Sequence, residues 1–133
     1  MPLYLDANAI IFAHEGPPPL QKAVTERIAW LSSSGVGDVL TSRLTRLECR
    51  VKPLRQQNQA LLNLYDIVFQ QSGLIVIDVS PAIIERATEI RAAHGLPTPD
   101  AIHLATALEI GADIFLTGDK RLARCPGIQF ELI

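Results

Sequence analysis

Residues 98–119 read TPDAIHLATALEIGADIFLTGD and carry the clearest local structural signal in this chain. Thr98 followed by Pro99 is typical of a helix start, with threonine as the N-cap and proline at the first helical position. The helix that follows is apolar nearly all round, which predicts that it is buried. Ile114–Thr117 is then a continuous apolar run, as expected for a strand inside a parallel sheet. A buried helix leading into a buried strand is the repeating unit of α/β folds.

Elsewhere in the chain, short apolar runs alternate with longer helical patterns. The expected strands are Leu3–Asp6, Val39–Ser42, Leu74–Val79, Ile114–Thr117 and Ile128–Leu132. The last of these alternates apolar and polar residues, which predicts an edge strand with one face in water. We therefore expect an α/β fold of the three-layer sandwich type, with a central, mostly parallel sheet of about five strands flanked by helices.

Apolar residues at helical spacing predict the helices between these strands. The expected helices are Leu20–Leu31, a short one between Ser42 and Pro53, one from Gln56 to about Gln71, and one around Ile83–Ile90 that stops at Gly95. The sequence contains no internal repeat, low-complexity tract or linker, so residues 1–133 are expected to form a single domain.

The composition limits the classes of function. The formal net charge is −2 and the pI about 5.9, whereas domains that bind nucleic acid over their whole surface are usually basic. A local basic rim around an acidic centre stays open. No apolar stretch approaches the roughly 20 residues that span a membrane, and the first residues lack the basic region of a signal peptide. Cys49 and Cys125 have no zinc-site spacing and are expected to be reduced thiols of a cytoplasmic protein.

Four acids stand where strands lead into helices or beside apolar helix faces: Asp6, Glu48, Asp100 and Asp119. Because the carboxyl ends of parallel strands converge on one crevice, we expect these side chains to lie on the same side of the sheet. Carboxylate oxygens suit Mg²⁺ or Mn²⁺. Each acid alone also has a simpler explanation, as a helix cap, as a first-turn acid that complements the helix dipole, or as a solvated surface residue. Their joint placement favours a metal-dependent enzyme.

The expected position of Glu48 depends on a helical wheel. On the helix after Ser42, an apolar stripe is formed by Leu44, Leu47 and Val51. Glu48 stands at the margin of this stripe, away from the arginines of the opposite side, so it is expected to point toward the crevice. His103 shares a helix face with Asp100 and is expected to support the site indirectly.

These segments resemble the PIN-domain nucleases and, among them, the VapC-type toxins of bacterial toxin–antitoxin pairs. The resemblance covers essentially the whole chain, through Leu5-Asp6-Ala7-Asn8, the Glu48 helix, Thr98–Ala107 and Phe115–Asp119. Pro99–Asp119 is its most specific part, and Glu48 is a weaker local match. Ala7 departs from the family pattern, since many members carry a Ser or Thr hydroxyl beside the first aspartate. This departure concerns a supporting hydrogen bond rather than a metal ligand.

The resemblance implies an endoribonuclease that depends on Mg²⁺ or Mn²⁺, with Asp6, Glu48, Asp100 and Asp119 holding the metal. Asn8 and Thr117 would orient the ligands or the attacking water. A small antitoxin partner and homodimerisation are implied as well. Metal ions suit the chemistry, because cleaving a phosphodiester requires an activated water and neutralisation of charge on the phosphoryl oxygens.

The substrate must be bound by other residues, because acids repel phosphate. Two basic groups are candidates for RNA contacts. One is Arg43, Arg46 and Arg50 on the helix after Ser42, with Lys52 and Arg55, and the other is Lys120, Arg121 and Arg124 after Asp119.

Two other classes of protein stay open. A phosphatase of the haloacid-dehalogenase type also begins with an aspartate after its first strand, but Asn8 stands where such an enzyme needs a second acid. A non-catalytic PIN-like binding module is the other alternative, although none of the four acids is missing.

Overall fold

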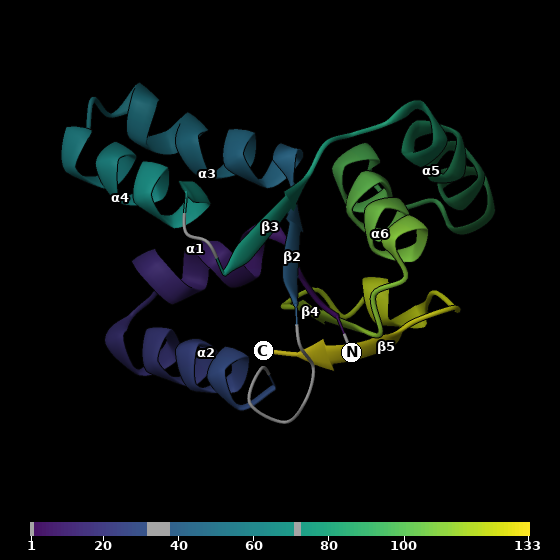
Figure 1. The fold of residues 1–133 in the computed structure, drawn as a ribbon, viewed down its shortest axis with the longest axis horizontal. Helices are drawn as coiled ribbons and strands as arrows, with labels where there is room; N and C mark the ends of the chain where they lie inside the picture. Colours follow the sequence, from purple (N-terminus) through teal and green to yellow (C-terminus); the bar gives the residue numbers. More distant parts are fainter. Residues whose placement is uncertain (1, 32–37, 71–72) are drawn as a thin grey trace.

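A five-stranded parallel sheet forms the centre of the computed structural model, which describes residues 2–31, 38–70 and 73–133 (Figure 1). Its strands are β1 (Leu3–Leu5), β2 (Val39–Ser42), β3 (Leu74–Ile77), β4 (Ile114–Thr117) and β5 (Gln129–Leu132). All four strand pairings are parallel. The expected α/β sandwich is therefore confirmed.

The strand order, β3-β2-β1-β4-β5, places the first strand in the middle of the sheet. The chain builds outward from β1 to β3 and then returns to place β4 on the other side of β1. The order of the strands thus reverses between β1 and β4. In open α/β sheets the crevice outside the carboxyl ends at such a point is the usual place for a binding site.

Helices cover both faces of the sheet (Figure 1). They are α1 (Ala7–Glu15), α2 (Pro18–Leu31), α3 (Arg43–Arg55), α4 (Gln59–Gln70), α5 (Pro81–His94) and α6 (Thr98–Ile110), with a 3-10 helix, η2 (Leu122–Arg124), before β5. Alternate strand residues enter different cores, because side chains of a strand point to opposite faces. Tyr4 and Phe115 pack on the side of α5 and α6, whereas Leu3 and Leu116 pack on the side of α1 and α4.

Several predicted boundaries were wrong in detail. Thr98 is not the N-cap of α6: Pro97 holds that position without a side-chain hydrogen bond, and Thr98 is already helical. Helix α3 passes through Pro53 and ends at Arg55 rather than stopping before the proline. Helix α4 begins at Gln59, because Asn58 accepts a hydrogen bond from the Leu61 amide at its start. Gln71, its expected end, lies outside the described residues.

One edge of the sheet differs from expectation. Strand β5 is an edge strand, as predicted, but β3 is the opposite edge, and Ile75 in it is 39% exposed. The continuous apolar run of β3 predicts a fully buried strand, and this prediction was wrong.

Both cysteines are buried free thiols. Within the described part of the chain, no helix has the length and hydropathy required to cross a membrane.

Candidate metal centre

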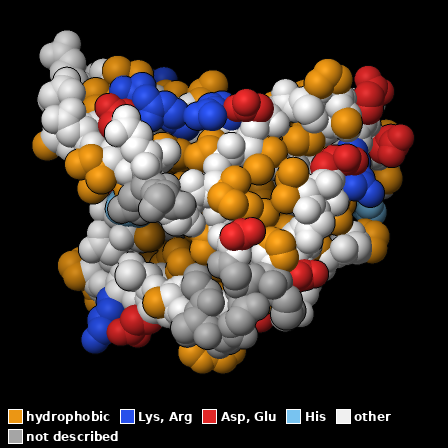
Figure 2. All heavy atoms as spheres, viewed as in Figure 1, with side chains coloured by type: hydrophobic (Ala, Val, Ile, Leu, Met, Phe, Trp, Pro, Cys, Tyr) orange, Lys and Arg blue, Asp and Glu red, His pale blue; other side chains and the backbone are white. Residues whose placement is uncertain are grey.

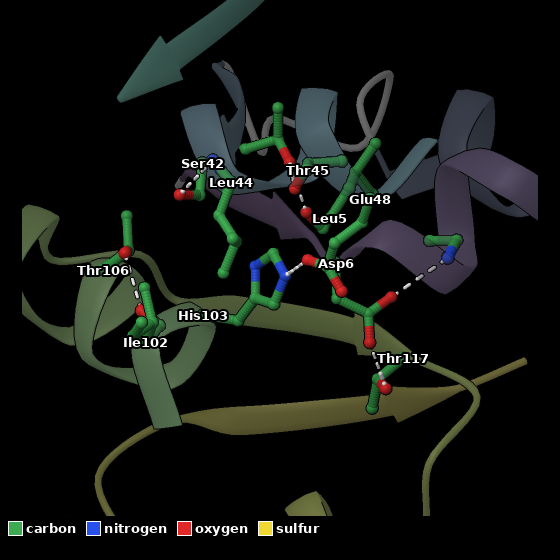
Figure 3. Close-up of polar contacts among 12 residues, drawn as sticks. Leu5, Asp6, Ser42, Leu44, Thr45, Glu48, Ile102, His103, Thr106 and Thr117 are labelled. Carbon is green, nitrogen blue, oxygen red and sulfur yellow. Dashed lines mark hydrogen bonds and ion pairs between the residues drawn. The ribbon is translucent and has the colours of Figure 1, made fainter. Parts of the chain in front are cut away.

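Asp6 lies at the point where β1 becomes α1, in the middle of the sheet. It is the N-cap of α1, and its Oδ1 accepts a hydrogen bond from the Ala9 amide at 3.0 Å. Its Oδ2 accepts one from the Thr117 hydroxyl at 2.5 Å (Figure 3). Only 4% of the residue is exposed. Both carboxylate oxygens are thus positioned by hydrogen bonds, which fixes the carboxylate at the carboxyl ends of β1 and β4.

Thr117 connects this aspartate to the next acid. Its hydroxyl donates to Asp6 and accepts a hydrogen bond from the Asp119 amide at 3.1 Å. The chain turns at Gly118, where an added Cβ would lie 3.2 Å from the Phe12 ring, so a small residue suits this turn. Ala7 itself carries no hydroxyl, and the hydroxyl beside Asp6 is supplied by Thr117 instead.

Asp100 lies in the first turn of α6, and Arg121 connects it to Asp119. The Arg121 guanidinium donates to Asp119 Oδ2 at 2.7 Å, and the same Nη2 lies 3.6 Å from Asp100 Oδ2. A cationic group of the protein therefore stands between two of the predicted metal-holding acids. A guanidinium in this position offsets part of the repulsion between the two carboxylates.

The helical-wheel interpretation of α3 was wrong about the buried face. Leu47 is 59% and Val51 42% exposed, whereas the buried positions are Thr45, Cys49 and Pro53. A buried threonine explains the error, because Thr45 Oγ1 lies 2.7 Å from Thr41 Oγ1 and is satisfied inside the protein. The buried face combines this threonine with Cys49 and Pro53, so a wheel drawn through the leucines and valine does not identify it.

Glu48 is nevertheless directed at the site, through a hydrogen bond that the sequence did not reveal. Its Oε1 lies 2.5 Å from His103 Nε2, and its side chain is 29% exposed (Figure 3). His103 is 2% exposed, and its Nδ1 lies 2.7 Å from the Tyr4 hydroxyl. Burial raises the pKa of the Tyr4 phenol, so the phenol stays protonated and donates to Nδ1. The Nε2 proton of His103 then points at Glu48.

Tyr4 is the supporting residue that sequence reasoning missed. It lies in a strand run that reads as apolar core, and only its position opposite α6 shows that it contacts His103. Thr41 was missed for the same reason: its hydroxyl lies 2.7 Å from the Leu5 carbonyl oxygen, next to Asp6. A hydroxyl inside an otherwise apolar strand is the one signal that could have indicated either residue.

Other predicted site residues stand apart from the acids. Asn8 is exposed on α1 and makes no side-chain hydrogen bond with any described residue. Arg43 pairs with Asp78 at 3.0 Å. Arg46 and Arg50 lie 3.0 and 3.5 Å from Asp66 on α4. A row of Lys and Arg side chains over α3 is visible in Figure 2, but these ion pairs direct the three arginines toward neighbouring acids.

The acids differ in their electrostatic environment. Burial raises the pKa of Asp6, and the charge of Asp100 raises it further, against the hydrogen bonds from Thr117 and Ala9. Burial also raises the pKa of Asp100, with the charge of Asp119 as the next cause. By contrast, hydrogen bonds from the Arg121 side chain lower the pKa of Asp119. Asp6 and Asp100 therefore hold their negative charge at a cost that a bound cation would reduce.

The chemical character of the four acids suits a divalent metal, although their side chains are not yet close enough together to form a metal site. In the described ranges, no three acid, histidine or cysteine side chains are close enough together to hold an ion as they stand. Yet the charge of Asp100 acts on Asp6, and the charges of Asp119 and Glu48 act on Asp100. All four acids carry hard oxygen ligands, and a protein cation, Arg121, already lies between two of them. The four acids thus supply the kind of oxygen donors that a divalent cation requires.

Comparison with known proteins identifies a family. The model of the PIN-domain family matches residues 3–128. Among solved structures, the chain is similar to VapBC2 from Rickettsia felis bound to a DNA fragment from its promoter, with a TM-score of 0.79, 17% identity, and 99% of this chain and 98% of that chain covered. It is also similar to a toxin–antitoxin complex from Klebsiella pneumoniae, with a TM-score of 0.72, 25% identity, and 95% and 94% covered.

A third similar structure is VapC20 of Mycobacterium tuberculosis, described as a toxin that cleaves the sarcin–ricin loop. Its TM-score is 0.69, with 16% identity, and 85% of this chain and 86% of that chain are covered. At identities of 16% and 17%, the first and third of these likenesses concern the fold. A search of curated protein sequences finds no match.

Proposed function

This chain belongs to the PIN-domain family, and we propose that it is a VapC-type toxin that hydrolyses RNA with the help of Mg²⁺ or Mn²⁺. The observation that carries the proposal is the position of Asp6. It lies at the central switch point of the sheet, buried and fixed by two hydrogen bonds, with Asp100 close enough to raise its pKa. A buried acid that is held in place by hydrogen bonds beside another acid suits a metal ligand.

Each of these side chains would have its own role in such a site. Asp6, Glu48, Asp100 and Asp119 would hold the metal, which when bound supplies the activated water and neutralises phosphoryl charge. Thr117 holds the Asp6 carboxylate through its hydroxyl. His103 orients Glu48, and Tyr4 keeps the His103 Nε2 proton directed at that carboxylate. Arg121 balances the charge of Asp119 and lies at the rim, where a phosphate would arrive.

Purified protein is expected to cleave RNA when Mg²⁺ or Mn²⁺ is present and to lose this activity in EDTA. The measurement is the cleavage of a mixed-sequence RNA followed on a denaturing gel, beside the hydrolysis of a generic phosphomonoester. Phosphomonoester hydrolysis without RNA cleavage would favour a phosphatase of the haloacid-dehalogenase type. If neither substrate is cut, the chain is a non-catalytic binding module.

We also propose a small antitoxin as a partner, because two of the similar structures are described as toxin–antitoxin or VapBC assemblies. Large apolar side chains are exposed on α3 and α4, namely Leu47, Val51, Leu54 and Ile67. Exposed apolar surface of this kind is typical of contact with another protein. A cluster of acids attracts an arginine from such a partner.

We propose in addition that the protein forms a homodimer and acts in the cytoplasm.

Expression of the protein alone in a bacterial host is expected to stop growth, and co-expression of its antitoxin is expected to restore it. The antitoxin should co-purify with the toxin, and size-exclusion chromatography with light scattering should give the mass of a dimer or of a larger complex. Normal growth during strong expression of soluble protein would reject the toxin proposal, even if the nuclease activity were present in vitro.

A further inference from the structure

A basic cavity of about 380 Å³ lies beside the acids, between the start of α6 and η2. One wall is the segment that joins α5 to α6, and the other carries two arginines. The residues that matter most to its shape and charge are His94, Gly95, Leu96, Pro97, Arg121 and Arg124. Its volume falls within the roughly 300–1,000 Å³ of cavities that bind small groups.

Local structure holds both walls in place. Helix α5 ends at Gly95, whose φ of 67° is a left-handed conformation that glycine adopts without strain. Arg91 then donates from Nη1 to the Leu96 carbonyl at 2.7 Å, which holds the next residues of the wall. On the other side, η2 is closed by a hydrogen bond from the Cys125 amide to the Leu122 carbonyl at 3.0 Å. The cavity is thus bounded by hydrogen-bonded backbone.

Two arginines line the cavity, although the chain as a whole is acidic. The described lining residues include Arg121 and Arg124, together with the imidazole of His94, and they include no acid. Within the described ranges, the Arg124 side chain has no ion pair or side-chain hydrogen bond. The exposed Arg124 guanidinium is therefore available to an anionic ligand, whereas Arg121 is already paired with Asp119.

Arg121 connects this cavity to the metal centre. Its guanidinium contacts Asp119 and Asp100 while the residue also lines the cavity. An anion bound at Arg121 would therefore lie next to Asp100 and Asp119, two of the four acids. In a nucleic acid, the nearest anion to one phosphate is the next phosphate of the same strand. Phosphate oxygens are also the groups that arginines contact most often in nucleic acids.

We propose that this cavity binds a phosphodiester group of the RNA strand adjacent to the one that is cleaved, with Arg124 as its main contact. The proposal rests on the proposed ribonuclease function. It favours this cavity over the α3 surface because Arg43, Arg46 and Arg50 are each paired with an acid, whereas Arg124 is not. Arg124 is a binding residue and does not touch the reacting phosphate.

Arg124→Ala is expected to raise the KM for RNA cleavage about three- to tenfold and to leave kcat unchanged, as for a lost charged contact on a partly exposed surface. Fluorescence anisotropy with a labelled RNA in EDTA should show the same loss of affinity. The slope of log K against log salt should fall by about 1, as for one lost phosphate contact. Arg124→Lys should restore most of the affinity, and Arg124→Gln should behave like the alanine variant.

Arg86→Ala is the matched control, because it removes the same charge from α5, where Arg86 pairs with Glu109 at 3.2 Å and does not line the cavity. Equal weakening in both variants, or an unchanged KM and salt slope in Arg124→Ala, would overturn the cavity assignment alone. A fall in kcat without a change in KM would also overturn it, in favour of a role at the reacting phosphate. Absence of RNA cleavage by the unaltered protein would instead reject the ribonuclease, while the binding assay in EDTA still tests the cavity.

Discussion

Asp6→Asn is expected to abolish metal-dependent RNA cleavage while leaving the fold intact. Asparagine has nearly the same shape and is among the preferred N-cap residues, so α1 keeps its start. Its neutral amide is a poor ligand for a hard cation, because it lacks the charge that Mg²⁺ and Mn²⁺ require. The rate should therefore fall by more than the 10–100-fold typical of losing a residue that merely supports a ligand. Initial rates with saturating Mn²⁺ measure the loss of cleavage, and circular dichroism of the variant checks that the fold is intact.

Asp113→Asn provides the matched control. Asp113 is an exposed aspartate next to the same central strands. It precedes β4 and so lies at the amino ends of the strands, opposite to Asp6. Its substitution should leave the cleavage rate within about twofold, as for a surface change away from a functional site. Full activity of folded Asp6→Asn protein would remove Asp6 from the metal centre and with it the main support for the proposed function.

The second large effect is on stability. Burial and the charge of Asp119 raise the pKa of Asp100 in the folded protein. An acid with a raised folded pKa contributes stability that is fully present below its unfolded pKa of about 3.9, and that is lost as pH rises through the folded pKa. At neutral pH the charged Asp100 therefore destabilises the metal-free protein. Asp100→Asn should melt at a higher temperature than the unaltered protein in EDTA, although most substitutions destabilise by about 1 kcal/mol.

Two comparisons of melting temperature, one against pH and one against Mn²⁺, distinguish a metal-binding Asp100 from a purely structural one. The advantage of Asp100→Asn should be present near pH 7 and should shrink as pH falls toward about 4, where the carboxyl takes up its proton. Adding Mn²⁺ should stabilise the unaltered protein by about 2.7 kcal/mol at 100 times its Kd, and the variant by much less. If the variant melts lower in EDTA and both proteins gain equally from Mn²⁺, Asp100 serves the helix dipole and not the metal.

The parts of the site that were predicted from sequence are those that strand ends determine. Asp6 and Asp119 each follow a strand, so both are placed at the carboxyl ends of the parallel strands by the topology alone. Glu48 sits on a helix whose inner face is defined by a hydrogen-bonded threonine, which a count of apolar residues does not detect. The Tyr4–His103–Glu48 chain joins three elements that are distant in sequence, and only their packing brings them together.

Helix starts were less predictable for a related reason. Thr98-Pro99 has the composition of an N-cap followed by a first helical residue, yet the helix begins one residue earlier, with Pro97 as its cap. The connection before Thr98 is held by a local hydrogen bond from Arg91 to the Leu96 carbonyl, which a reading of the Thr98-Pro99 pair alone does not take into account.

The central position of β1 has a consequence for how the protein is made. Its register pairs Leu3 with both Val39 and Ile114, so the middle of the sheet is complete only when β4 is present. During translation, roughly 110 residues separate the two strands, and at about 5–20 residues per second their synthesis takes about 5–20 s. Pairing between such distant segments is also slow to fold. The hydrogen bond between Thr117 and Asp6 therefore forms only after nearly the whole sequence has been synthesised.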